Sequence, residues 1–97
     1  MTYEQILELA KKGEITIVDV RTKEEYDMGR IPTAINCDVQ TIMRDAPNVL
    51  TSKDHPYYVY CQTGYRSQVA AMQLDMMGYT NINDLGGIID WPLDIEY

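Results

Sequence analysis

Apolar residues occur in this chain in two patterns that alternate along its length. Short, mostly apolar runs at residues 15–20 and 57–61 are rich in β-branched and aromatic side chains, which is typical of buried strands. Between such runs apolar residues recur at helical spacing, as Ala70, Leu74 and Met77 do. Strands separated by helices predict an α/β fold, with a mostly parallel sheet and helices on both of its faces.

Two capping-box pairs mark the starts of predicted helices. Thr2 with Gln5 opens a first amphipathic helix, and Thr22 with Glu25 opens a shorter one that Gly29 closes. In such a pair, the side chain of each residue accepts the backbone N–H of the other residue. Both helix starts are therefore well defined.

The boundaries of the other elements are predicted from the positions of glycine and proline, which often end helices and strands. Residues 39–46 carry a weak helical pattern that Pro47 is expected to break, and the helix that follows residue 66 is expected to end at Gly78. The remaining predictions are short strands at 34–37 and 81–85, a turn at Gly86–Gly87 and a final helical turn at 88–91.

The residues that follow the strand at 57–61 carry the candidate chemistry. Cys61 ends that strand, a five-residue turn follows it, and a helical pattern begins at Ser67. The turn consists of Gln62, Thr63, Gly64, Tyr65 and Arg66. Ligands of open parallel sheets bind at the carboxyl ends of the strands, and the N–H groups of a tight loop entering a helix converge on an anion. The helix dipole and Arg66 would both stabilise a thiolate there. We therefore predict that Cys61 is a nucleophile and that residues 62–66 form an anion-binding loop.

Cysteines at the end of core strands often only pack, so the reactive interpretation depends on neighbouring residues. Gly64 allows the loop backbone to curl with a positive φ, and Arg66 supplies a fork of donors. Cys37 has no such surroundings. Burial is the favoured interpretation for Cys37, with a resolving-thiol role as the alternative.

Length and charge limit the function further. The 97 residues are enough for one domain, 1–97, with a single core, and no segment has the length of a membrane span or the character of a signal peptide. We therefore expect a cytoplasmic protein. The formal charge of −7 argues against nucleic acid or an anionic membrane as partner. Two cysteines and one histidine without a Cys-x-x-Cys pair predict neither a metal site nor a cofactor.

Several other residues have simpler structural interpretations. Asp19 and Arg21, at the end of a strand, are expected to be a structural pair. His55 is expected to lie in a solvated turn. The methionines at 72, 76 and 77 are expected to fill the core.

The succession of motifs along the chain resembles the single-domain rhodanese family. The residues that carry this resemblance, in order, are Asp19-Val20-Arg21, Glu25-Tyr26, Gly29 to Asn36, Val59 to Ser67, Ala70-Ala71, Leu74, Gly78-Tyr79, Leu85-Gly86-Gly87 and Trp91. The resemblance implies a rhodanese-like fold and a sulfurtransferase that moves a sulfane sulfur through a persulfide on Cys61. The donor would be a small anion such as thiosulfate, and the acceptor a thiol, cyanide or a sulfur-accepting protein.

The sequence departs from the family pattern at three positions. Arg30 stands where histidine is common and is expected to affect only a surface turn, or to add positive charge near the site. Thr33 replaces a frequent glycine, so its turn is expected to differ, and Tyr65 is expected at the rim of the site.

Two alternatives to an active sulfurtransferase remain open. One is a non-catalytic or persulfide-carrying domain that docks on a partner. The other is a phosphatase or arsenate reductase on the same fold, which the resemblance disfavours, because such loops place five residues between cysteine and arginine, whereas four lie between Cys61 and Arg66.

Overall fold

The computed structural model describes all 97 residues, which build one four-stranded parallel sheet. The spatial order is β2 (Ile35–Asn36), β1 (Thr16–Asp19), β3 (Tyr57–Cys61) and β4 (Ile82–Gly87). Every neighbouring pair is parallel, so all four strands end at the same edge. The predicted α/β class and parallel sheet are confirmed.

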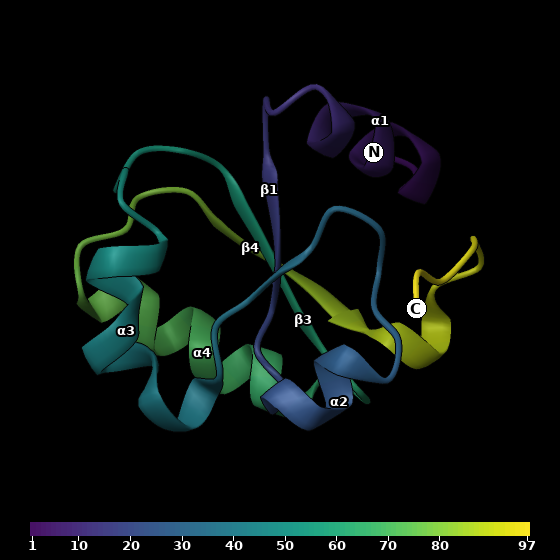
Figure 1. The fold of residues 1–97 in the computed structure, drawn as a ribbon. Coiled ribbons are helices and arrows are strands. Elements are labelled where there is room, and N and C mark those ends of the chain that lie inside the picture. The colour runs from purple at the N-terminus through teal and green to yellow at the C-terminus, as the bar shows by residue number, and fades with distance from the viewer.

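Helices cover both faces of the sheet (Figure 1). On one face lie the 3-10 helix η1 (Val39–Thr41), α3 (Ile42–Val49) and α4 (Tyr65–Met76). On the other lie α1 (Tyr3–Lys11) and the segment that contains the 3-10 helix η2 (Ile88–Asp90). None of these helices has the length and apolar character needed to cross a membrane.

Alternate residues of the central strands supply the two cores. Val18 and Val59 pack with the side chains of α4, whereas Ile17 and Tyr60 pack with Trp91 and the side chains of α1. This alternation follows from the two-residue repeat of a strand. Strands buried on both faces therefore appear in the sequence as mostly apolar runs.

Both predicted capping boxes form. The Thr2 hydroxyl accepts from the Gln5 N–H at the start of α1. The Thr22 hydroxyl does the same for the Glu25 N–H at the start of α2 (Lys23–Asp27), a short helix that lies beyond the end of β1 (Figure 1). Gly29 follows the end of α2 with a φ of +147°.

The prediction that Pro47 breaks a helix was wrong. The break comes earlier, at Thr41, and α3 continues through Pro47 to Val49. Proline removes only the bond from its own nitrogen to the Met43 carbonyl, and Ala46 is fully buried on the inner side of α3. Tertiary packing of that side thus holds the helix together across the proline.

The prediction of a turn at Gly86–Gly87 was also wrong, because both residues belong to β4. Gly86 lies opposite Tyr60 and Gly87 opposite Cys61, after a bulge that leaves Leu85 unpaired in the register. Gly86 has a φ of +96°, which is the left-handed conformation that such a bulge needs. The bulge brings β4 alongside the end of β3.

The methionines of α4 do not fill the core as predicted, apart from Met77, which packs against it. Met72 and Met76 are 64% and 79% exposed. Ala70 and Leu74 occupy the buried stripe of α4, and a residue two positions away points to the opposite side of a helix.

His55 lies in the predicted turn before β3, but it is partly buried instead of solvated. Its Nε2 lies 2.9 Å from the Thr16 hydroxyl, and its ring packs edge-to-face on Tyr57. Arg30 also has a structural role, since it pairs with Glu96 at 3.3 Å and lies over the Tyr26 ring. It joins the C-terminal segment to the turn after α2.

Thr33 is the one residue other than glycine with a positive φ, +75°. The sequence predicts an altered turn here, yet Thr33 itself takes the left-handed conformation that glycine favours. A side chain in this conformation costs about 1–2 kcal/mol, and branching at Cβ adds to the crowding.

We predict that Thr33→Gly stabilises the protein by about 0.5–1 kcal/mol, because relief of the strain exceeds the entropy that a glycine adds to the unfolded chain. Urea unfolding measures the change. Thr51→Gly is the control, since Thr51 is exposed and lacks a positive φ, and it should destabilise. Equal effects of the two substitutions would contradict the assignment of strain to Thr33.

Candidate active site

Cys61 lies at the carboxyl end of β3, directly before the N-terminus of α4. Its sulfur accepts the N–H of Gly64 at 3.0 Å and the N–H of Ser67 at 3.3 Å. The residue is 1% exposed, so the thiol lies beneath the loop rather than on its surface. The structure therefore brings together the predicted nucleophile, the Gly64 N–H of the predicted loop and the N–H of Ser67, which is the residue after that loop.

The sulfur of Cys61 takes the place of a helix cap. Gly64 is the N-cap of α4, has a φ of +102°, and offers no side chain to the free N–H groups of the first turn. Cys61 accepts the N–H of Ser67, which is the group that a capping serine or aspartate would normally satisfy. Negative charge on the sulfur is favoured here, because two N–H donors and the positive end of the helix dipole meet at it.

Ser67 supports the loop from below and is fully buried. Its hydroxyl donates to the Gly64 carbonyl at 3.0 Å and lies 3.5 Å from the Gly86 carbonyl oxygen in β4. Ser67 therefore acts through two groups. Its hydroxyl holds the loop in place over Cys61, and its backbone N–H donates to the Cys61 sulfur.

Arg66 makes a two-pronged ion pair with Glu25 of α2. Nη1 and Nη2 of Arg66 lie 2.7 and 2.9 Å from the two carboxylate oxygens of Glu25. This hydrogen bonding lowers the pKa of Glu25 from 4.5 to about 2, and the same contacts raise the pKa of Arg66 above its ordinary value. The role of Arg66 in anion binding stays a prediction, but its charge is already balanced.

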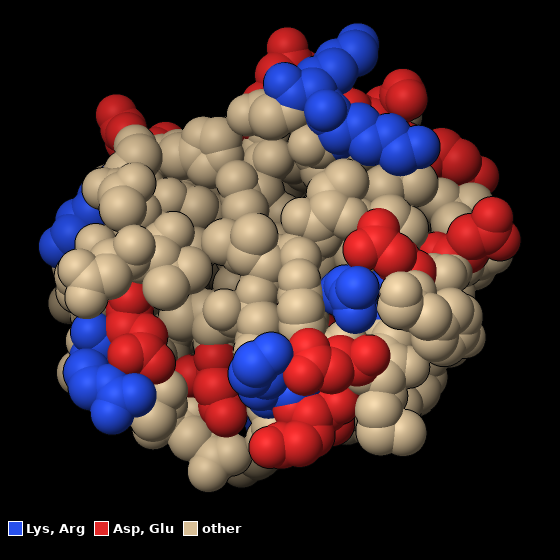
Figure 2. All heavy atoms as spheres, viewed as in Figure 1, with Lys and Arg blue, Asp and Glu red and all other residues tan.

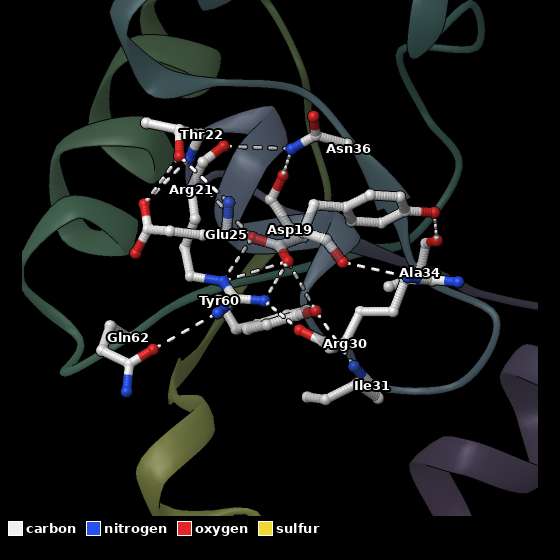
Figure 3. Close-up of polar contacts among 12 residues, drawn as sticks. Asp19, Arg21, Thr22, Glu25, Arg30, Ile31, Ala34, Asn36, Tyr60 and Gln62 are labelled. Carbon is white, nitrogen blue, oxygen red and sulfur yellow. Dashed lines mark hydrogen bonds and ion pairs between the residues drawn. The ribbon is translucent and has the colours of Figure 1, made fainter. Parts of the chain in front are cut away.

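A buried network joins the strand ends beneath the loop (Figure 3). Arg21 holds the Asp19 carboxylate through Nε and Nη2, with a shortest distance of 2.7 Å. Arg21 also donates to the Gly29 carbonyl and to Oε1 of Gln62 in the loop. The hydroxyl of Tyr60 donates to Asp19. The predicted structural role of Asp19 and Arg21 is confirmed.

The other loop residues are placed at the outer side of the site. The Gln62 and Thr63 side chains are exposed, apart from the contact of Gln62 with Arg21. Tyr65 is 74% exposed, in agreement with its predicted place at the rim. Ile89 of η2 joins this rim, because its N–H donates to the Gln62 carbonyl at 3.3 Å and it is 61% exposed.

Gly87 determines how closely the loop approaches the sheet. A Cβ atom at this position would lie 2.6 Å from the Gln62 carbonyl oxygen and 2.9 Å from Thr63 backbone atoms. Neither contact is possible without a shift of the backbone. The absence of a side chain at Gly87 therefore lets the loop pack directly on β4.

Cys37 is buried, as the favoured interpretation predicted, and lies one residue beyond β2. Burial raises the pKa of its thiol to about 11, and the charges of Asp45 and Asp38 act in the same direction. Cys37 is therefore a neutral packing residue at physiological pH.

Sequence reasoning missed three residues of the site: Glu25, Ser67 and Gly87. The sequence predicts a capping box for Glu25, which forms, but the carboxylate of Glu25 also reaches Arg66. The sequence signal that could have indicated this ion pair is the excess of acidic residues in α2, together with the single arginine of the loop. No group of three His, Cys, Asp or Glu side chains is close enough together to hold a metal ion.

Comparison with known proteins gives a consistent result. Residues 2–93 match the family model of the rhodanese-like domain. The thiosulfate sulfurtransferase GlpE of Coxiella burnetii is 32% identical over 97 residues, which is 94% of this chain and 89% of that protein. A structure described as rhodanese with anions from E. coli has a TM-score of 0.78 and 28% identity, covering 84% of this chain and 96% of that one.

A longer protein also matches. The adenylyltransferase and sulfurtransferase UBA4 of Candida albicans is 33% identical over 101 residues, which is 97% of this chain. The match spans only 23% of the Candida protein.

We predict that Gly87→Ala loosens the loop, because the new methyl group would collide with the Gln62 carbonyl. The amide protons of Gly64 and Ser67 should exchange with solvent about tenfold faster or more, relative to that of Leu74 inside α4. Gly13→Ala is the control for general destabilisation, since its φ of +77° strains an alanine while a Cβ there meets no atom within 4 Å and does not touch the loop. It should not speed exchange at Gly64 and Ser67 relative to Leu74. Unchanged exchange at Gly64 and Ser67 in Gly87→Ala would contradict the close approach.

We also predict that the Glu25–Arg66 pair stabilises the protein above pH 4.5 and that this contribution disappears as the pH falls towards 2. The folded-state pKa of Glu25 is about 2 and its ordinary value is 4.5, so protonation removes the pair within that window. Glu25→Gln should cost about 1–2 kcal/mol at pH 6, less than the pKa shift alone implies, because both side chains are a third exposed.

Urea unfolding of the native protein and of Glu25→Gln between pH 6 and 2 measures this contribution. The difference between the two free energies of unfolding should shrink towards zero at the acid end. A difference near zero at every pH would show that Glu25 acts only through its capping box, which glutamine can also form. A difference that persists unchanged down to pH 2 would show that the ion pair is not its source.

Proposed function

This chain belongs to the rhodanese-like domain family, and we propose that it is a sulfurtransferase that carries a sulfane sulfur as a persulfide on Cys61. The observation that carries the proposal is the pair of N–H donors from Gly64 and Ser67 on the Cys61 sulfur. Such donors stabilise a thiolate before the reaction and an anionic persulfide after it.

The reaction has two halves. In the first, the Cys61 thiolate attacks the outer sulfur of thiosulfate, the S–S bond of thiosulfate breaks, and sulfite leaves with the electron pair. In the second, an acceptor thiolate attacks the outer sulfur of the Cys61 persulfide and regenerates the Cys61 thiolate. No proton has to move in either half when both thiols are ionised, so no general base is required beside Cys61.

Several features support sulfur transfer over the chemistry of tetrahedral oxyanions. The sulfur is enclosed, since Cys61 is 1% exposed and the three hollows of the surface lie around α1, away from the loop. One additional sulfur atom demands far less space than a phosphoryl group in flight. The four-residue spacing between Cys61 and Arg66 agrees with this small site.

The donor and acceptor are proposed by analogy. The Coxiella relative is named a thiosulfate sulfurtransferase, which makes thiosulfate the first donor to assay. A thiol, cyanide or a sulfur-accepting protein would take the sulfur, and a reducing cytoplasm would keep Cys61 free to react.

We predict that exposure to thiosulfate increases the intact mass by one sulfur atom, located on Cys61 by peptide mapping. Cys61→Ser should abolish both the mass increase and sulfur transfer, because a serine hydroxyl is not ionised at this position and cannot hold a persulfide. Cys37→Ala is the control and should retain both.

The three outcomes of this experiment separate the candidate functions. Mass increase with turnover supports the sulfurtransferase, whereas mass increase without turnover to any thiol indicates a persulfide-carrying domain. Loss of transfer in both folded variants would instead indicate a mechanism with two thiols and would falsify the single-nucleophile account.

A further inference from the structure

The two arginines nearest to the loop are both neutralised by carboxylates. Arg66 is paired with Glu25 through two contacts of 2.7 and 2.9 Å, and Arg21 is paired with the buried Asp19. The side chains at 62, 63 and 65 are uncharged. No unpaired cation of the loop therefore faces a ligand at Cys61.

Helix α2, which is joined to the loop by the Glu25–Arg66 pair, adds negative charge beside the loop. Besides Glu25 it carries Glu24 and Asp27, and its only lysine, Lys23, is paired with Asp27 at 3.1 Å. Acidic side chains accordingly gather around α2 at the lower edge of the molecule, with basic ones among them (Figure 2). With a formal charge of −7 on the chain, a second negative charge on a ligand is opposed at this edge.

The rim of the loop carries two exposed apolar side chains beside the exposed polar side chains of Gln62 and Thr63. Tyr65 and Ile89 are 74% and 61% exposed and lie at the two ends of the loop, Tyr65 within it and Ile89 bonded to the Gln62 carbonyl. Exposed aromatic and branched side chains beside a reactive group can contact an apolar carrier. A hydrated inorganic dianion such as thiosulfate has no apolar surface to bury against Tyr65 and Ile89, so these side chains do not increase its affinity.

From this charge balance and rim we propose that the site prefers a monoanionic sulfane-sulfur donor carried on an apolar organic group over thiosulfate, and that Glu25 sets this preference by neutralising Arg66. The inference rests on the proposed function, because it concerns the donor of the same Cys61 persulfide. Glu25 is a positioning residue here. It holds the guanidinium of Arg66 and does not contact Cys61.

Methanethiosulfonate is a suitable probe, since it differs from thiosulfate by a methyl group in place of one charged oxygen. The Cys61 thiolate attacks its outer sulfur, a new S–S bond forms, the old one breaks, and methanesulfinate leaves with the electron pair. A total charge of two negative units is present before and after the step. With thiosulfate the same step carries three negative units throughout.

The experiment compares the two donors at equal ionic strength with one thiol acceptor. Each kcat/KM is divided by the rate constant of the uncatalysed reaction of the same donor with that thiol, which removes the difference in intrinsic reactivity. We expect the normalised value to be about tenfold higher for methanethiosulfonate, since one unit charge near a partly exposed site is worth roughly that factor.

Two variants of α2 test the role assigned to Glu25. Glu25→Gln leaves the charge of Arg66 unbalanced while glutamine still fits the capping box. The preference for methanethiosulfonate should shrink at least threefold, through a lower KM for thiosulfate. Asp27→Asn removes the same unit of charge from the same helix without touching Arg66, so it should reduce the preference far less than Glu25→Gln does.

The outcomes separate this inference from the proposed function. If neither donor adds a sulfur atom to Cys61, the proposed function fails. If both donors add one but the normalised values are equal, or if Asp27→Asn changes the preference as much as Glu25→Gln does, only the present inference is overturned. The last result would assign the effect to overall charge instead of the Glu25–Arg66 pair.

Discussion

The carboxylate of Asp19 is fully buried, and the arrangement of the whole carboxyl edge depends on how its charge is satisfied. Removing a charge from water costs several kcal/mol unless donors surround it. Arg21 supplies three donors and the Tyr60 hydroxyl a fourth. Because Arg21 also holds the Gly29 carbonyl and the Gln62 side chain, this one charge links β1 and β3 to the turn after α2 and to the loop over Cys61. The loop is therefore anchored to a rigid network beneath it.

Backbone N–H groups position the Cys61 thiol above that network, and the charged side chain of the loop, Arg66, is neutralised by an ion pair. Cys61 caps α4 through the N–H groups of Gly64 and Ser67. Arg66, the loop's own cation, is paired with Glu25. Glu25 performs two tasks at once, because it caps the N-terminus of α2 and fixes Arg66. A substitution of Glu25 would therefore affect the site in two ways, because it would leave the charge of Arg66 unpaired and could shift the position of α2.

Predictions from local pattern succeeded where the physics is local. The two capping boxes require only residues three positions apart, and the strand that ends at Cys61 is visible in its run of aromatic and β-branched residues. Predictions failed where a distant segment decides the outcome. Pro47 remains helical because Ala46 is packed, and His55 is held by Thr16 of β1. Met72 and Met76 are exposed, contrary to prediction, because Ala70 and Leu74 occupy the buried side of α4.

The sequence by itself determined the alternation of strands and helices, the parallel sheet, and the position of Cys61 at the entrance to a helix. It could do so because periodicity, caps and turn residues act over a few neighbouring positions. Only the tertiary structure decided that Gly87 lies in β4 against the loop, and that Arg66 turns to Glu25. Both contacts join segments about twenty or more positions apart, and their geometry follows from how the strands stack and where α2 docks, which no local pattern encodes.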